Sequence, residues 1–542
     1  MKKRRILVTN ALTYANGELH LGHIVGYLQS DIWVRFQRLR GHECYFIAGC
    51  DCHGTPIMLE ARRRALSPES LVEELFQKQL QICQRFDFKF DHFGKTSSET
   101  NKDICSKIFQ ELEKNDFLSL VEVEQLYDQK EEIYLPDRFI KGRCPCCKAS
   151  DQYGDNCEEC GSTYNAGALE EPRSIISETT PILKKSQHWF FRLSRLEKEL
   201  EEWTRNHLDL PIARKVGEWF KEGLQDWDIT RDAPYYGIPI PNCHNKYLYV
   251  WFDAPFGYAS IFKEYLEKTM KPKEAQKEFH HFWKKGSNET ELYHFIGKDI
   301  MYFHSLFWPG LLMASNWRDP TRVFVHGFLK IEGDKMSKSR GTFLKAADYL
   351  ENYQAEDLRY YLACKLNSTN DDIDFQIEGF RQRVNSDLVN KVVNIGSRTI
   401  RLLEREYSSQ LAPEISTSPL AELFRTGAEE IGRYYEGRNF SGVTRRIIQL
   451  ADQVNCYLAD EKPWELIKSN QADRLKAWQV LTIAVNHFRQ LLILLSPITP
   501  ELARQGRKLF QKTENWTWEE LFQYQTGTAL QPYQTLKERI PS

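Results

Sequence analysis

Long apolar runs are lacking in this chain of 542 residues. Crossing a bilayer takes about 20 consecutive apolar residues, whereas the best candidate is Leu491–Leu495, which is typical of a buried helix segment. The basic start Lys2–Arg5 and the apolar Ile6–Val8 imitate a signal peptide, but polar residues soon interrupt the run and no small-residue cleavage site follows. We therefore expect no membrane-spanning segment and a first strand preceded by a basic cap.

An excess of one charge sign is also lacking, because 73 Lys and Arg side chains oppose 75 Asp and Glu side chains. A protein that coats nucleic acid non-specifically needs a broad positive field, so a nucleic-acid partner of this chain would be held by local patches. The 13 cysteines are an odd number and are scattered apart from one cluster. This usage differs from the even framework of a secreted disulfide scaffold and predicts the reducing cytoplasm.

Apolar periodicity predicts that the chain opens with a strand, a helix and a second strand. The first β-rich run is Arg5–Thr9, apolar positions recur every three or four residues through Leu21–Leu39, and Cys44–Ala48 is the next β-rich run. This order is typical of a parallel α/β sheet, whose ligands bind beyond the carboxyl ends of the strands. The loops Asn10–His23 and Gly49–Pro56 occupy those positions.

The rest of the sequence predicts that the sheet is interrupted by an inserted segment and that the C-terminal region is helical. The segment 114–231 looks inserted, because strand-like runs return beyond it at Tyr247–Phe252, Leu292–Ile296 and Val323–Val325. Beyond about residue 355 amphipathic helical patterns follow, notably at Arg381–Arg405, Ala421–Tyr435 and Leu475–Leu495. At about 150 residues per domain, the length agrees with three or four domains. The predicted fold class is α/β, with a parallel sheet split by an insertion and followed by an all-helical C-terminal domain.

A cysteine cluster in the insertion predicts a metal site. Two Cys-x-x-Cys pairs, separated by nine residues, supply the candidate ligands Cys144, Cys147, Cys157 and Cys160. Four thiolates can surround one Zn²⁺ tetrahedrally, and such a closed site stabilises a fold rather than activating water. The alternative is redox-active or unpaired thiols, and Cys146 is a surplus thiol that could compete as a ligand.

Two further motifs have the composition of phosphate-binding segments. His20-Leu21-Gly22-His23 opens the first predicted helix, where free backbone N–H groups and the positive end of the helix dipole favour an anion. Gly333–Gly341 places the cations Lys335, Lys338 and Arg340 between glycines, as in a mobile loop that closes on a polyphosphate. Each motif alone has an ordinary alternative, namely a surface histidine pair and a solvated basic loop.

Taken together, the two motifs resemble the paired signatures of class I aminoacyl-tRNA synthetases: His20–His23 is the first signature and Lys335–Ser339 the second, about 300 residues later. The sequence around these two signatures closely resembles that of the methionyl-tRNA synthetase family. The matching segments are Ala11–Gly17, Asp51–Ile57, Tyr249–Pro255 and His294–Ile300. In that family the cysteine pairs lie in the connective insertion, as they do here.

The resemblance covers essentially the whole chain and implies a Rossmann-type sheet with five regions. These are 1–113 and 232–325 for the two halves of the catalytic domain, 114–231 for the zinc-bearing insertion, 326–385 for the second signature and a linking region, and 386–542 for a helical anticodon-binding domain. It implies that L-methionine reacts with ATP and Mg²⁺ to give methionyl-adenylate and pyrophosphate. The methionyl group then passes to the terminal ribose of initiator and elongator methionine tRNAs.

The resemblance also implies the residues of each site. Asp51 would take the substrate ammonium, and Lys338 would be the more important of the two pyrophosphate-binding lysines. The catalytic set would be His20, His23, Lys335, Lys338 and Arg231. The ATP-binding set would be His20, Gly22, His23, Asp299, Lys335 and Lys338. The methionine pocket would be Ala11, Leu12, Tyr14, Asp51, Trp251, Ala254, Pro255, Tyr258, Ile300 and His304.

In the helical region, Asn390–Arg398 and Glu461–Trp464 resemble the family's anticodon-reading elements. Single-stranded RNA loops are read by stacking and by hydrogen bonds to base edges. The resemblance therefore implies that Trp464 stacks on a base of the CAU anticodon, assisted by Asn394, Arg398 and Pro463. Many relatives continue into a dimerisation domain, whereas this chain stops at Ser542, so we expect a monomer.

Four alternatives remain beside this interpretation. A cysteine enzyme of the same class would use zinc beside the catalytic helix, with an open metal position, and a leucine enzyme would carry a larger insertion. A nucleotidylyltransferase would not need the helical region. A catalytically idle RNA-binding protein would not need His20, His23, Asp51, Lys335 and Lys338, all of which are present.

Overall fold

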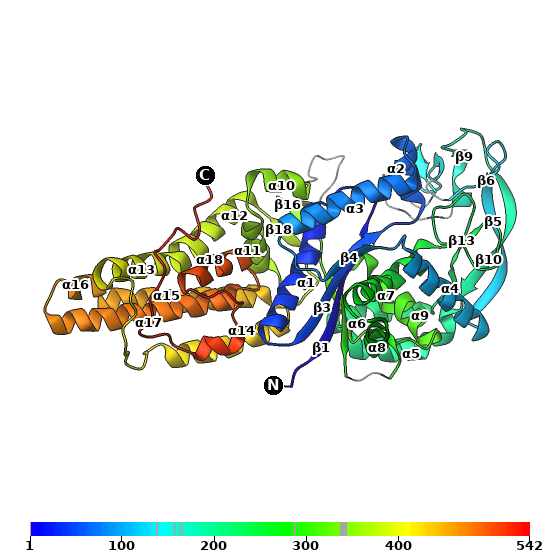
Figure 1. Cartoon of the computed structure of the whole chain (residues 1–542). Coiled ribbons are helices and arrows are strands. Elements are labelled where there is room, and N and C mark those ends of the chain that lie inside the picture. Colours follow the sequence, from blue (N-terminus) through cyan, green and yellow to red (C-terminus); the bar gives the residue numbers. More distant parts are fainter. Residues whose placement is uncertain are drawn as a thin grey trace.

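The computed structural model describes residues 2–136, 139–154, 157, 159–160, 162, 164, 166–286, 289–335 and 344–541. The molecule is elongated (Figure 1). The strands of the inserted segment lie at one end, the helices of the C-terminal region lie at the other, and the parallel sheet lies between them. In the described part of the chain, no helix combines the length and apolarity that a membrane span requires.

The central sheet is parallel throughout, as predicted. Its strand order is β15-β14-β1-β3-β2, and β4 also pairs with β3. The bounds are β1 Arg5–Asn10, β2 Thr13–Tyr14, β3 Glu43–Asp51, β4 His92–Lys95, β14 Glu291–Gly297 and β15 Arg322–His326. Since β14 pairs directly with β1, the segment between β4 and β14 interrupts a single sheet.

The helix after β1 forms where the apolar periodicity predicted it. Helix α1 spans Leu21–Leu39, and Gly41, with φ +80°, takes the left-handed conformation just beyond its end. The prediction of a strand over Tyr247–Phe252 was wrong, because strand β13 covers Lys246–Leu248 and helix α7 begins at Val250. A short aromatic run fits a buried strand and the first turn of a buried helix equally well. Here most of α7 is buried, which removes the polar face that marks a surface helix.

The helices that flank the sheet come mainly from its two sequence halves. Their bounds are α2 Thr55–Arg63, α3 Pro68–Arg85, α4 Glu99–Lys114, α7 Val250–Thr269, α8 Pro272–Trp283 and α9 Trp308–Ala314. Phe303–Phe307 forms a short π-helix just before α9. Such widened turns are rare and occur often at functional sites.

The inserted segment is built on one long antiparallel pair of strands. The strands of its first sheet are β5 Leu118–Asp128, β6 Ile133–Tyr134, β10 Ile182–Phe191 and β11 Trp227–Asp228. A second sheet holds β7 Ile140–Arg143, β8 Gln152–Tyr153 and β9 Glu170–Ser174. Helices α5 Glu197–His207 and α6 Leu210–Glu222 follow, and β12 Thr230–Asp232 pairs with β13 to return the chain to the central domain.

The region after β15 begins with a small sheet and continues as helices. Strands β16 Leu329–Ile331, β17 Asp334–Lys335 and β18 Ile373–Phe375 form the sheet. The helices are α10 Ala346–Asn352, α11 Ala355–Lys365, α12 Ile377–Val384, a π-helical stretch Asn385–Val393, α13 Asn394–Tyr407, α14 Ala421–Glu436, α15 Phe440–Glu461, α16 Pro463–Leu466, α17 Gln471–Leu495 and α18 Pro500–Leu509. Within 386–541 every regular element is therefore helical, as predicted, apart from one isolated bridge between Gln410 and Ala529.

A single apolar core joins this helical region to α1. Arg359 of α11 is almost fully buried, and its guanidinium lies 2.7 Å from the buried carboxylate of Asp31 on α1. The same guanidinium donates to the carbonyl oxygens of Pro497 and Ile498 at 3.1 and 3.0 Å. The helix that carries the first signature is thereby anchored to the C-terminal helices by a desolvated ion pair.

Candidate active site and metal site

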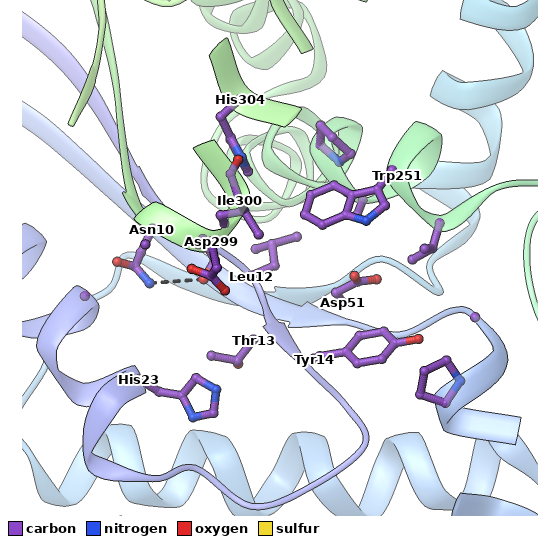
Figure 2. Close-up of a pocket in the computed structure, with 18 of the residues that line it drawn as sticks. Asn10, Leu12, Thr13, Tyr14, His23, Asp51, Trp251, Asp299, Ile300 and His304 are labelled. Carbon is purple, nitrogen blue, oxygen red and sulfur yellow. Dashed lines mark hydrogen bonds between the residues drawn. The ribbon is translucent and has the colours of Figure 1, made fainter. Parts of the chain in front are cut away.

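A cavity of about 820 Å³ opens at the carboxyl ends of β1 and β3, where parallel sheets bind ligands. Asn10 and Asp51 are the last residues of those two strands and both line it. All ten residues of the predicted methionine pocket line this cavity, as do His20, Gly22, His23, Asp299 and Arg231. In the view of Figure 2, Trp251, Asp51 and Tyr14 lie toward one end, and His23 lies toward the other.

Aromatic rings form the apolar end of the cavity. The indole of Trp251 stacks on Phe303 with ring centroids 3.6 Å apart and planes 6° apart. The imidazole of His304 lies nearly perpendicular to Trp251 and bonds through Nε2 to the hydroxyl of Tyr258 at 2.8 Å. Burial lowers the pKa of His304 to about 4, so its ring is neutral at neutral pH. This end of the cavity therefore suits an uncharged, polarizable side chain such as a thioether.

Asp51 places a carboxylate beside that apolar end. Its Oδ1 atom is buried and has no hydrogen-bond partner among the described residues. Burial raises the pKa of Asp51 well above its ordinary value, and the carboxylate of Asp253 raises it further. An unpartnered buried carboxylate oxygen is costly. A cationic ligand group at this position would remove that cost.

The first signature forms a capping box from two histidines. His20 is the N-cap of α1, and its Nδ1 accepts the Gly22 backbone N–H at 3.1 Å. His23 reaches back, and its Nδ1 accepts the His20 backbone N–H at 3.2 Å. Burial and the neighbouring His20 lower the pKa of His23 to about 3. Since Nδ1 is an acceptor in a neutral ring, the proton of His23 is on Nε2, which makes that atom a hydrogen-bond donor.

Two glycines let the polar end of the cavity pack closely. A Cβ on Gly26 of α1 would meet Nε2 of His326 at 3.1 Å and Oδ1 of Asn10 at 3.2 Å. A Cβ on Gly297, at the end of β14, would meet Oδ1 of Asp299 at 2.5 Å. The sequence analysis did not identify Asn10, Gly26 or His326, although all three line the cavity. For Gly26, the available sequence signal was a glycine inside a strongly helical pattern, which often marks a close contact.

Arg231 lies on β12, the strand that returns the chain from the insertion. Its guanidinium carbon lies 3.8 Å from the centroid of Tyr249, and Nη1 lies 3.5 Å from the carboxylate of Asp228. The insertion thus contributes a positioned cation to the cavity lining.

The segments around the two signatures meet in space. The backbone N–H of Leu21 donates to the carbonyl of Leu344 at 3.1 Å, and that of Ala346 donates to Leu19 at 2.9 Å. Lys345 also forms an ion pair with Glu18 at 2.7 Å. The backbone of Lys335 belongs to β17, whereas Lys338 lies outside the described residues. The tertiary fold therefore brings the described flanks of the second signature to the start of α1.

The predicted cysteine ligands form a compact cluster. The sulfur atoms of Cys144, Cys147, Cys157 and Cys160 all lie within 4.8 Å of one another, with 3.8 Å from Cys144 to Cys160 and 3.5 Å from Cys147 to Cys157. Four sulfurs at about 2.3 Å from one tetrahedral Zn²⁺ would be separated by about 3.8 Å, so the arrangement fits a metal. The backbone N–H groups of Cys147 and Cys160 point at Cys144 and Cys157, respectively. Cys146 is exposed and is not part of the four-sulfur cluster.

Two of the predicted anticodon residues are in contact. The guanidinium carbon of Arg398, on α13, lies 4.8 Å from the ring centroid of Trp464, on α16. Asn394 lies one helical turn before Arg398, and the buried Pro463 begins α16 beside Trp464. Arg398 is exposed and Trp464 is half-buried. These residues are far along the chain from the cavity, in the helical end of the molecule (Figure 1).

The split parallel sheet, and the contact between the start of α1 and the described flank of the second signature, are features of the class I tRNA synthetase scaffold. The family model described as tRNA synthetases class I (M) matches residues 6–400, well over half of the chain. The chain therefore belongs to this family, the methionine group of the class I tRNA synthetases.

Solved structures share the fold over nearly the full length. A methionyl-tRNA synthetase of Mycobacterium tuberculosis in complex with methionyl-adenylate is 22% identical, with a TM-score of 0.80, and the match covers 98% of this chain and 99% of that one. A second structure of the M. tuberculosis enzyme bound by methionyl-adenylate is 21% identical, also with a TM-score of 0.80, covering 98% and 100%.

Proposed function

We propose that the 820 Å³ cavity is where this chain carries out the reaction of its family, the ATP-dependent charging of tRNA with methionine. The observation that carries this proposal is the composition of the cavity. A neutral aromatic end, a buried carboxylate oxygen without a partner among the described residues, and a histidine-capped helix N-terminus all face one space. These three parts match the thioether, the ammonium group and the phosphates of the two substrates. The bound methionyl-adenylate in the two similar structures has the same three parts.

Activation needs no protein nucleophile. An oxygen of the methionine carboxylate bonds to the α-phosphorus of ATP, and the bond to the bridging oxygen breaks, so that pyrophosphate leaves with the electron pair. Catalysis in such a step is positioning and charge stabilisation. In the proposed arrangement Asp51 orients the ammonium, and the Nε2–H of His23 donates to the phosphate region. Arg231, Lys335 and Lys338 neutralise charge, Asp299 holds the ATP ribose, and Mg²⁺ accompanies the ATP phosphates.

In the second step a terminal ribose hydroxyl of the tRNA attacks the carbonyl of the adenylate, and AMP leaves. We propose that the helical region selects the tRNA through its CAU anticodon, read by Trp464, Arg398 and Asn394. The contact between Arg398 and Trp464 supports this assignment, because a guanidinium and an indole present flat faces on which a splayed base can stack. We further propose that the protein acts as a monomer in the cytoplasm.

We propose that the cysteine cluster holds one Zn²⁺. All four ligand positions are filled by sulfur, so the ion would stabilise the β7–β9 sheet of the insertion and would not take part in the chemistry. None of the four cysteines lines the cavity, which supports a structural role.

Isotope exchange between ATP and pyrophosphate tests the activation step directly. We expect exchange that depends on methionine and is absent with leucine, isoleucine, cysteine or no amino acid. Exchange that depends on another amino acid would overturn the substrate assignment. No exchange with any of them, in folded and metal-loaded protein, would overturn the proposed use of the cavity.

A further inference from the structure

A second buried carboxylate, that of Asp253, lies near the proposed ammonium site. Asp253 is in the first turn of α7, directly before the cavity-lining residue Ala254, and its side chain is fully buried. Its Oδ1 atom has no hydrogen-bond partner among the described residues. Asp51, which lines the cavity, and Asp253, which adjoins its lining at Ala254, therefore each have one buried oxygen without a partner among the described residues.

The two carboxylates are linked by one histidine. His53 follows Asp51 by two residues, and its Nδ1–H donates to Oδ2 of Asp253 at 2.7 Å. Its carbonyl oxygen accepts the hydroxyl of Tyr14 at 2.6 Å, which fixes the backbone between Asp51 and the imidazole. The side-chain amide of Asn101 donates to the backbone carbonyl oxygen of Asp253 at 3.4 Å. Residues of β2, β3, α4 and α7 therefore together fix the positions of Asp51 and Asp253.

The charges around Asp51 and Asp253 are few. The titratable groups that interact electrostatically with one or both carboxylates are Tyr14, Cys52, His53, Cys105, Tyr235 and Tyr258, and Arg231 and Tyr249 line the same cavity as Asp51. Of these groups, His53 and Arg231 are the two that can carry a positive charge. Arg231 already lies beside Asp228, which leaves His53 as the partner of Asp253.

Two buried carboxylates close together resist ionising together. Burial raises the pKa of both, the charge of Asp253 adds to this for Asp51, and His53 opposes the rise for Asp253. The histidine thereby favours negative charge on Asp253, and burial together with that charge opposes ionisation of Asp51 in the empty cavity. An incoming ammonium supplies the positive charge that lets Asp51 ionise as well.

We propose that His53 and Asp253 are positioning residues for the substrate ammonium, forming with Asp51 a two-carboxylate site in which methionine binding releases the Asp51 proton. The inference deepens the proposed function and rests on its assignment of Asp51 to the ammonium. Asp253 acts at a distance through its charge, and His53 acts through Asp253. No bond other than the O–H of Asp51 changes, and the proton leaves to solvent.

Calorimetry of methionine binding, repeated in buffers of different ionisation enthalpy, measures this proton directly and requires no turnover. For the unaltered protein we expect proton release that is largest at pH values between the pKa of Asp51 with methionine bound and its higher pKa in the empty cavity. The affinity should fall as the pH drops through that value, because the proton must then be removed before the ammonium can bind. Binding with no proton release across the neutral and mildly alkaline range would overturn the proposal.

Asp253→Asn separates the two effects of the second carboxylate. It removes a charge that attracts the ammonium, so methionine affinity at high pH should drop roughly 10-fold. It also removes the repulsion that keeps Asp51 protonated, so proton release should move to lower pH. A variant that was merely misfolded or loosely packed would lose affinity without this shift. An unchanged pH dependence in folded Asp253→Asn would overturn the role of Asp253.

Two further variants test the histidine. His53→Phe should behave like Asp253→Asn, and the double variant should be no weaker than Asp253→Asn alone, because His53 acts through Asp253. His53→Gln, which retains an N–H donor, should restore much of the original behaviour. Additive losses, or failure of the glutamine to rescue, would assign His53 a separate role. Asp357→Asn is the matched control, since Asp357 of α11 is also a buried carboxylate but pairs with Lys537 near the C-terminus, and neither residue lines the cavity.

The design separates failure of this inference from failure of the proposed function. Asp51→Asn should abolish measurable methionine binding in either case if Asp51 takes the ammonium. Normal binding by Asp51→Asn would overturn the assignment of the ammonium site itself. Weak binding by Asp51→Asn together with an unaltered proton release in Asp253→Asn would overturn the two-carboxylate site alone.

Discussion

Replacing Trp464 with alanine should separate the two steps of the reaction. Trp464 is half-buried at the start of α16, and the guanidinium of Arg398 lies 4.8 Å from its ring centroid. The cavity that would bind methionine and ATP contains no residue from α13 or α16. We therefore expect Trp464→Ala to leave methionine activation unchanged and to impair the charging of tRNA.

The size of the effect follows from the stacking of one base. Loss of an aromatic side chain that stacks on a nucleic-acid base costs about 1–3 kcal/mol, which corresponds to about 5- to 150-fold. Local packing should survive, because Pro463, which begins α16, is buried and remains in place. We expect the loss to appear in kcat/KM for tRNA, with Arg398→Lys giving a smaller loss because an ammonium has no flat face.

The assay compares methionine-dependent pyrophosphate exchange with tRNA aminoacylation for the same preparations. Trp478→Ala is the matched control, because Trp478 is also half-buried in the helical region and stacks on Tyr407 with ring planes 3° apart. The control should lose stability to a similar degree without a selective loss of charging. Equal losses in both assays for Trp464→Ala, or equal charging defects in the two tryptophan variants, would refute the assignment of Trp464 to the anticodon.

Three further outcomes can be tested independently. Trp251→Ala should raise KM for methionine about tenfold and leave KM for ATP within about twofold, because the ring lies at the apolar end of the cavity; equal changes in both constants, measured by pyrophosphate exchange, would contradict that placement. Cys157→Ser should lower the metal content, measured by elemental analysis, and increase hydrogen exchange in the insertion while the central sheet stays protected; full metal content with unchanged exchange would show that Cys157 is not a ligand. Asp31→Ala should reduce the free energy of unfolding by about 3–5 kcal/mol in urea, because it leaves the guanidinium of Arg359 buried and unpaired; an additional Arg359→Met should recover part of the loss, and an additive double variant would argue against the ion pair.

Much of the fold was predictable because it rests on local patterns. The apolar periodicity over Leu21–Leu39 places α1 at the residues where the structure has it. The return of β-rich runs after the insertion predicted a resumed parallel sheet, and β14 and β15 complete it. The strand predicted over Tyr247–Phe252 failed because a buried helix lacks a polar face, so periodicity could not distinguish the two.

For the sites, the sequence by itself determined the chemical types and the tertiary structure decided which of them act together. Cysteine spacing predicted the four-sulfur cluster, since each Cys-x-x-Cys pair is a local structure in which the short turn sets the positions of its two ligands. Resemblance to a family indicated the cavity residues, and the fold brings together those that the structure describes. No local pattern, however, could show that His53 lies 2.7 Å from Asp253, 200 residues further along, or that two carboxylate oxygens have no partner among the described residues. Pairing and desolvation depend on how distant segments pack, and the packing of α7 against β3 is what buries these carboxylate oxygens.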